Sequence, residues 1–154
     1  MKAFKLLIVL FISNICFAEY LEGLQIKKIV DGDTVHVFHQ GEVYKIRLIE
    51  IDAPERNQPY GKDSTGYLKF LLNEGSVDVN ISGTDRYGRK LGRLYWNGRD
   101  INRAMVIAGY AWVYDDYVTD RSFYKNQSKA RDLKKGLWKE SNPISPWKWR
   151  KRKK

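Results

Sequence analysis

The chain has very few of the side chains that build disulfides and thiolate sites. Its 154 residues include one cysteine, two histidines and four prolines. The cysteine is Cys16, and no second cysteine exists to pair with it. Intramolecular disulfides and zinc sites built from several thiolates are therefore excluded. His36 and His39 fall in a predicted strand and turn without a partner motif, and we expect both to face solvent.

The first 18 residues differ in composition from the rest of the chain. Lys2 and Lys5 precede an apolar run from Leu6 to Ile12, and Cys16-Phe17-Ala18 offers small residues for cleavage. This pattern predicts a secretory signal peptide over 1–18 and a secreted or periplasmic product. An uncleaved anchor and a lipid-modified Cys16 are the alternatives, although the run is shorter than the roughly 20 residues that span a bilayer. Cleavage would remove the only thiol and leave no cysteine nucleophile.

Positive charge dominates the sequence. Lysine and arginine total 28 against 18 acidic residues, for a net charge of +10. Such an excess attracts nucleic acid, anionic lipid or acidic polysaccharide, and charge alone does not choose among them. The segment 141–154 ends in a tail rich in tryptophan, lysine and arginine, which suits loose, salt-sensitive contact with nucleic acid. No second long apolar segment follows the first, so we expect no stable membrane insertion after cleavage.

Hydrophobic periodicity and turn residues predict a small mixed domain over 19–140. Strands are expected at 24–30, 34–38, 43–51, 77–81 and 90–96, and helices at 64–73, 101–108 and 121–135. Ser64 is expected to cap the first helix and Asp100 the second. The slip in alternation at Leu48-Ile49 indicates a bend or bulge. Five short strands, with a helix after the third, favour a β-barrel with helices: a five-stranded OB-fold barrel with about three helices.

Three polar clusters carry residues suited to phosphate chemistry. They are Asp31-Gly32-Asp33-Thr34, the segment from Arg47 to Glu55, and Asp85-Arg86-Tyr87-Gly88-Arg89. Each cluster alone also fits an ordinary polar turn or strand end. Hydrolysis of an anionic phosphodiester needs a cation, rigid donors and a base that activates water. Carboxylates can hold a hard cation such as calcium, and guanidinium groups match phosphate oxygens.

Taken together, the clusters resemble the two signatures of the staphylococcal nuclease family, over about Ile26 to Trp138. The first is Asp-Gly-Asp-Thr followed after twelve residues by Arg-Leu-x-x-Ile-Asp-x-Pro-Glu, and the second is Asp-Arg-Tyr-Gly-Arg-x-Leu-Gly. The resemblance implies that Ca²⁺ is bound by Asp33, Asp52 and the carbonyl of Ala53, where the family often has threonine. It also implies that Glu55 is the general base, and that Arg47 and Arg89 bind the phosphate.

The same resemblance implies how the substrate is held. Tyr87 matches a substrate-contacting tyrosine, and Arg86 beside it could join a phosphate clamp. Tyr117 aligns with a second family tyrosine, whereas Tyr114 aligns only with a shift, and Trp112 fits base stacking and core packing equally.

The implied function is a monomeric, calcium-dependent nuclease that cuts DNA and RNA with low sequence selectivity and leaves 3′-phosphate ends. Two alternatives are a non-catalytic nucleic-acid-binding module of the same family and an exported cationic surface-binding protein. An exported cationic surface-binding protein would not need Asp33, Asp52 and Glu55.

Overall fold

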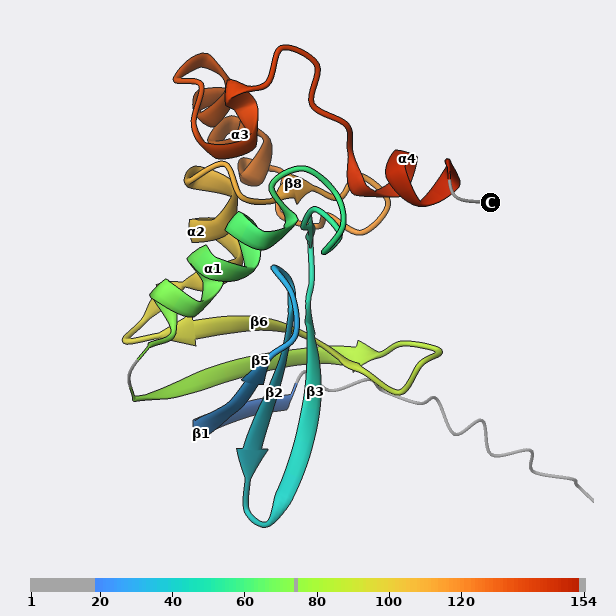
Figure 1. The fold of residues 1–154 in the computed structure, drawn as a ribbon. Helices are drawn as coiled ribbons and strands as arrows, with labels where there is room; N and C mark the ends of the chain where they lie inside the picture. Colours follow the sequence, from blue (N-terminus) through green and yellow to red (C-terminus); the bar gives the residue numbers. More distant parts are fainter. Residues whose placement is uncertain (1–18, 74, 153–154) are drawn as a thin grey trace, which may run out of the picture.

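A computed structural model describes residues 19–73 and 75–152, and the predicted signal peptide lies outside them. Five long strands form a barrel: β1 (Glu19–Ile29), β2 (Thr34–His39), β3 (Glu42–Leu48), β5 (Ser76–Thr84) and β6 (Lys90–Trp96). Their order is β3-β2-β1-β5-β6, and a parallel β3–β6 pairing joins the two outer strands. The barrel is therefore closed, as the sequence predicts (Figure 1).

Strand β1 makes this closure possible because it pairs with two neighbours along its 11 residues. The register shifts between Leu21 and Leu24 against β5, and between Ile26 and Lys28 against β2. Such irregularities bend a strand and increase its twist. Alternate residues of the strands point inward, and Leu24, Val35, Ile46 and Leu94 are fully buried. Burial of each such side chain contributes roughly 1.5–3 kcal/mol.

The helices gather at one end of the barrel (Figure 1). They are α1 (Gly61–Leu71), α2 (Ile101–Ile107), α3 (Ser122–Asp132), the 3₁₀ helix η1 (Gly136–Lys139) and α4 (Pro146–Lys151). Short strands β4 (Ile51–Asp52) and β8 (Trp112–Val113) pair with each other, and β7 (Arg99–Asp100) pairs antiparallel with the end of β6. The tight β3–β4 connection thus lies at the helical end of the barrel, where the first two polar clusters also meet.

Two local predictions need correction. Helix α1 begins at Gly61, and Ser64 is fully buried one turn inside it. Its hydroxyl donates to the Tyr110 carbonyl at 2.7 Å, because the helix packs against the chain that follows α2, so Ser64 is not the cap. Asp100 does cap α2, accepting from the Arg103 amide at 2.9 Å. The two histidines of β2 are partly buried rather than fully exposed.

Among residues 19–73 and 75–152, no helix has the length and apolar character needed to cross a membrane.

Candidate active site

The turn between β1 and β2 presents Asp33 to the helical end of the barrel. Asp33 donates its amide to Asp31 Oδ1 at 3.1 Å and accepts from the Thr34 hydroxyl at 3.1 Å. Gly32 is buried, and a Cβ there would lie 1.9 Å from Ser64 Oγ and 2.7 Å from the Ala53 side chain. A glycine is therefore required for the turn to sit against α1. The Asp31-Gly32-Asp33 segment therefore lies close against Ser64 and Ala53, in addition to connecting β1 and β2.

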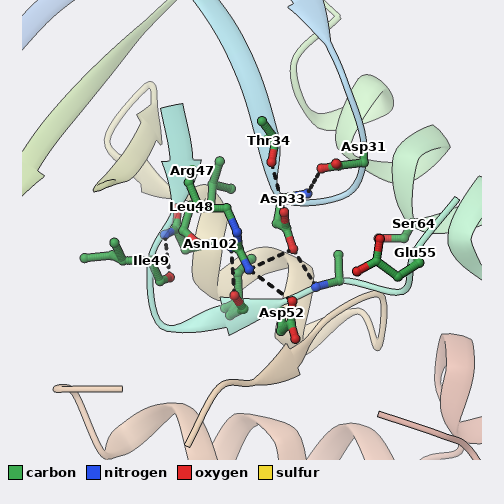
Figure 2. A network of polar contacts seen from close by, with 12 residues as sticks. Asp31, Asp33, Thr34, Arg47, Leu48, Ile49, Asp52, Glu55, Ser64 and Asn102 are labelled. Atoms are coloured by element: carbon green, nitrogen blue, oxygen red, sulfur yellow. Dashed lines mark hydrogen bonds and ion pairs between the residues drawn. The ribbon is translucent and has the colours of Figure 1, made fainter. Parts of the chain in front are cut away.

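Arg47 joins the two predicted calcium ligands. Its Nη2 lies 3.2 Å from Asp33 Oδ2 and 3.1 Å from Asp52 Oδ1. Its Nη1 donates to the carbonyl of Leu48 and, at 2.9 Å, to that of Ile51. Figure 2 shows this guanidinium between the two carboxylates, which come from the β1–β2 turn and from β4. Two clusters distant in the sequence thus meet at one arginine.

A sharp corner between β3 and β4 makes this meeting possible. Glu50 adopts φ 67°, and its carboxylate is buried. That carboxylate accepts from the amides of Thr119 and Asp120 at 3.0 and 2.7 Å and pairs with Arg93. Asn102 on α2 is also fully buried and donates to the Ile49 carbonyl at 2.9 Å (Figure 2). The corner, the α2 helix and the loop before α3 are therefore fixed to one another, which confirms the bend predicted at Leu48-Ile49.

Glu55 follows on the loop between β4 and α1. Its amide is bound by Gln58 Oε1 at 3.1 Å, and its carbonyl accepts from the Gln58 amide at 2.8 Å. A Cβ at Gly61 would lie 1.9 Å from the Glu55 carbonyl oxygen, so a side chain there would push the loop away from α1. The carboxylate itself is more accessible than Asp52, with side-chain exposures of 39% and 2%. This difference suits a base that must reach solvent water.

An arginine from the far end of the chain enters the same site. Arg150 on α4 contacts Asp52 Oδ2 with Nη2 at 2.9 Å and Asp52 Oδ1 with Nη1 at 3.2 Å. Its Nη1 also lies 2.8 Å from Glu55 Oε1. One guanidinium therefore links the predicted ligand and the predicted base.

Arg89 lies in the β5–β6 hairpin, immediately before Lys90, the first residue of β6. In the parallel β3–β6 register Arg47 is opposite Leu91, two residues after Arg89. Arg89 Nε and Nη2 both contact Asp85 Oδ2 at 2.8 Å. Within the described residues its contacts are to its own hairpin and not to Asp33, Asp52 or Glu55.

The predicted substrate-contacting residues fall into two groups. Arg86 and Tyr87 are exposed at the β5–β6 hairpin, where Arg86 Nη2 lies 2.7 Å from the Tyr87 hydroxyl. Tyr114 and Tyr117 lie together beyond β8, with ring centroids 4.8 Å apart. Tyr117 is 60% exposed. Tyr114 is stacked on Trp147 of the tail, at 5.6 Å and an interplanar angle of 8°.

The electrostatics of the carboxylates favour a bound cation. Burial, together with repulsion from Asp33, raises the pKa of Asp52 to about 6 against the hydrogen bond from Arg150. Burial and the Asp33 charge likewise raise the pKa of Asp31 to about 6. A divalent cation would offset both effects, and two converging carboxylates supply the hard oxygens that calcium prefers. The residues therefore fit calcium.

Few protein side chains are available to bind a calcium ion at this site. Residues 19–73 and 75–152 contain no group of three or more His, Cys, Asp or Glu side chains arranged around a metal position. Ala53, whose carbonyl is the third predicted donor, uses its amide to bind Asp33 Oδ2 at 2.7 Å. A calcium ion here would need backbone and water oxygens in addition to the two carboxylates.

Sequence reasoning missed three residues of this region. Glu50 stands at an unspecified position of the first signature, and a glutamate gives no sign in sequence that it will be buried. Asn102 lies on the predicted core helix and resembles any polar surface position. Arg150 stands among several basic neighbours, so the pattern alone could not single it out. The positive charge of the tail was the only sequence feature that pointed toward Arg150, and it pointed equally to the neighbouring basic residues.

Comparison with known proteins agrees with this geometry. Residues 45–140 match the family described as staphylococcal nuclease homologue. The chain is 44% identical over 130 residues to an uncharacterized endonuclease of Escherichia coli O157:H7, covering 84% of this chain and 85% of that one. It is 37% identical over 151 residues to an uncharacterized endonuclease of Haemophilus influenzae, covering 97% and 84%. It is 35% identical over 162 residues to a micrococcal nuclease of Shigella flexneri, covering 98% and 92%. The fold, the meeting of the two parts of the first signature at Arg47 and these matches show that the chain belongs to the staphylococcal nuclease family.

Proposed function

We propose that this nuclease is a calcium-dependent phosphodiesterase that hydrolyses DNA and RNA with low sequence selectivity. The nuclease class follows from the family, which also implies a nucleic acid substrate. The observation that carries the finer proposal is the convergence of Asp33 and Asp52 on Arg47, with Glu55 connected to Asp52 through one guanidinium. A purely cationic binding protein has no use for buried acids at this place.

Asp33, Asp52 and the Ala53 carbonyl would hold the calcium ion. When bound, it would supply positive charge to the phosphate and to the charge that develops on its non-bridging oxygens. The raised pKa of Asp52 would then fall, because the cation favours the ionised carboxylate. Both acids would serve as permanent anions and not as proton carriers.

The remaining residues would perform the proton transfer and the charge stabilisation. Glu55 takes a proton from a water whose oxygen forms the new bond to phosphorus. The bond from phosphorus to the 5′ oxygen breaks, and this oxygen takes a proton from solvent water while Glu55 returns its proton to solvent, so the products carry 3′-phosphate and 5′-hydroxyl ends. Arg47 and Arg89 stay protonated at working pH and stabilise the five-coordinate phosphate. Both are engaged with acids in this structure, so a phosphate must compete for their donors.

Substrate contact would come from the β5–β6 hairpin, which carries the second signature, and from the loop after β8. Arg86 and Tyr87, which are exposed, would contact the sugar-phosphate backbone, and Tyr114 and Tyr117 would offer ring faces to a base. Contacts to phosphate and ring faces carry little sequence information. We therefore propose low selectivity among sequences.

The decisive experiment is cleavage by the purified protein with calcium or with a chelator. Plasmid, single-stranded DNA and RNA are incubated with wild type, Glu55→Gln and the control Glu42→Gln, which alters an exposed glutamate on β3. Calcium-dependent cleavage that falls by roughly 10²–10⁴ in Glu55→Gln alone supports the proposal. Products that become extendable by polymerase only after phosphatase treatment would identify 3′-phosphate ends. Tight binding without cleavage in wild type would instead support the non-catalytic module.

Export and oligomeric state are separate proposals. We propose that 1–18 is removed and that the nuclease acts as a monomer outside the cytoplasm. Amino-terminal sequencing of the protein from its native host should begin at Glu19, and light scattering should give the mass of one chain. An intact Met1 or a larger mass would overturn the corresponding proposal.

A further inference from the structure

The carboxy-terminal segment folds back onto the site. Figure 1 shows α4, the last helix, beside the loop that joins β4 to α1. Gln58 Nε2 donates to the Ile144 carbonyl at 2.6 Å, and Trp149 Nε1 donates to Asn57 Oδ1 at 3.2 Å. Trp147 stacks on Tyr114. The tail is therefore docked onto the domain.

Arg150 is the point at which this segment reaches the predicted reaction centre. It contacts both oxygens of Asp52 and one oxygen of Glu55, at 2.8–3.2 Å. Asp52 is buried, with 2% of its side chain exposed, and the Arg150 guanidinium gives it and Glu55 a positively charged partner.

A guanidinium and a divalent cation compete for the same oxygens. Asp52 Oδ1 already accepts from Arg47, and Arg150 takes both of its oxygens. Because the two cations also repel each other, calcium binding at Asp52 requires Arg150 to move. At the same time the tail covers one ring face of Tyr114, the tyrosine expected to stack on a base. One segment thus blocks a predicted metal ligand, the predicted base and a predicted substrate contact.

We propose that α4 is an autoinhibitory strap, with Arg150 standing in the place of the metal ion, and that a divalent cation displaces it. This inference rests on the proposed function, since it takes Asp52 as a calcium ligand. The strap has six residues, too few for a helix to persist alone in water, so displacement also unfolds it. Lys148, Arg150 and Lys151 are then free to meet the phosphates of a bound nucleic acid.

Calcium affinity measured by calorimetry tests the strap without relying on catalysis. Arg150→Gln is compared with wild type and with Lys151→Ala, which removes a charge from an exposed position on the same helix. Because wild type must release Arg150 before binding, Arg150→Gln should bind Ca²⁺ about five- to tenfold more tightly. Lys151→Ala should stay within about twofold of wild type. Unchanged or weaker binding in Arg150→Gln overturns the strap, and weaker binding would make Arg150 a supporting residue of the site.

Limited trypsin digestion supplies a second readout. Trypsin cuts after Lys148, Arg150 and Lys151, so calcium should accelerate loss of the tail from wild type. An unchanged or slower rate of loss contradicts displacement.

Asp52→Asn separates failure of the strap from failure of the site. If Asp52→Asn abolishes calcium binding while Arg150→Gln matches wild type, only the strap is wrong. If wild type and Arg150→Gln bind no calcium, or Asp52→Asn binds as tightly as wild type, the metal site and the strap fail together.

Discussion

The guanidinium of Arg150 contacts both oxygens of Asp52, although the two residues are 98 positions apart in the chain. Arg47, five residues before Asp52, contacts Oδ1 of the same carboxylate. The buried acid is therefore bound by two arginines from different parts of the chain. One is fixed by the barrel, and the other is carried by a short terminal helix. Their roles are expected to differ, and substitutions can separate them.

Arg47→Lys should impair catalysis much more than it affects folding. A lysine keeps the charge but cannot span Asp33, Asp52 and the two backbone carbonyls, because an ammonium lacks the planar fork. We expect kcat/KM for plasmid cleavage to fall by roughly 10²–10³, the range for losing one donor that stabilises a transition state. Arg99→Lys, at an exposed position of β7, is the control and should retain activity. Activity of Arg47→Lys within tenfold of wild type would count against phosphate stabilisation by this side chain.

The parts of the fold that depend on local patterns could be predicted from the sequence. Alternating apolar residues and turn signals gave the five barrel strands, and the capping pattern gave α2 behind Asp100. The convergence of Asp33, Asp52 and Arg47 could also be expected, because these residues belong to one signature, which spans the β1–β2 turn, β3 and β4. Such information is local, or comes with the resemblance to the family.

The remaining features depend on tertiary contacts, which produce no periodic pattern in the sequence. Glu50 is buried because a sharp corner turns it toward Arg93 and the Thr119 amide, and nothing near it in the sequence indicates that partner. The docking of Arg150 depends on Trp147 meeting Tyr114 from far along the chain. A basic tail has the same composition whether it is solvated or bound.

Glu50→Gln should destabilise the protein although position 50 is not expected to take part in chemistry. Glu50 is buried, pairs with Arg93 and accepts from two backbone amides, so neutralising it leaves Arg93 without its full partner. We expect a loss of about 2–4 kcal/mol in unfolding free energy, measured by urea denaturation. Glu42→Gln should differ from wild type by less than about 0.5 kcal/mol.

A double-mutant cycle with Arg93→Gln checks the cause of this loss. If the Glu50–Arg93 pair accounts for it, the two substitutions should be strongly non-additive. Additive losses would mean that the backbone hydrogen bonds of Glu50, and not the pair, hold the corner. Hydrogen exchange over 114–120 should rise in Glu50→Gln in either case.

Gly32→Ala should disturb the metal site by displacing the turn that carries Asp33. The new Cβ would lie 1.9 Å from Ser64 Oγ and 2.7 Å from the Ala53 side chain, so the turn or α1 must move. Overpacking of this kind costs about 1–3 kcal/mol. Melting temperature and calcium affinity should therefore both fall.

Gly66→Ala is the matched control, because a Cβ there meets nothing within 4 Å and the residue lies within α1. It should raise stability by roughly 0.5–1 kcal/mol through helix propensity. Calcium affinity that is normal in Gly32→Ala would show that Asp33 tolerates the shift.

Asp120→Asn should produce a stability loss that depends on pH. Hydrogen bonds from the hydroxyl and amide of Ser122, with help from Arg103, lower the pKa of Asp120 from 3.8 to about 2. A pKa depressed by folding adds stability above the unfolded value, and that stability disappears as pH falls through the folded value. At pH 7 we expect Asp120→Asn to be less stable by about 1 kcal/mol.

Urea denaturation at a series of pH values checks this dependence. The gap between wild type and Asp120→Asn should be constant above about pH 5, roughly halved near pH 3 and lost near pH 2. Asp132→Asn, at an exposed position near the end of α3, is the control for charge alone. Because Asp120 also donates its amide to Glu50, a gap that persists unchanged to pH 3 would assign the loss to the altered loop backbone. The ionised carboxylate would then contribute nothing to the anchoring of α3.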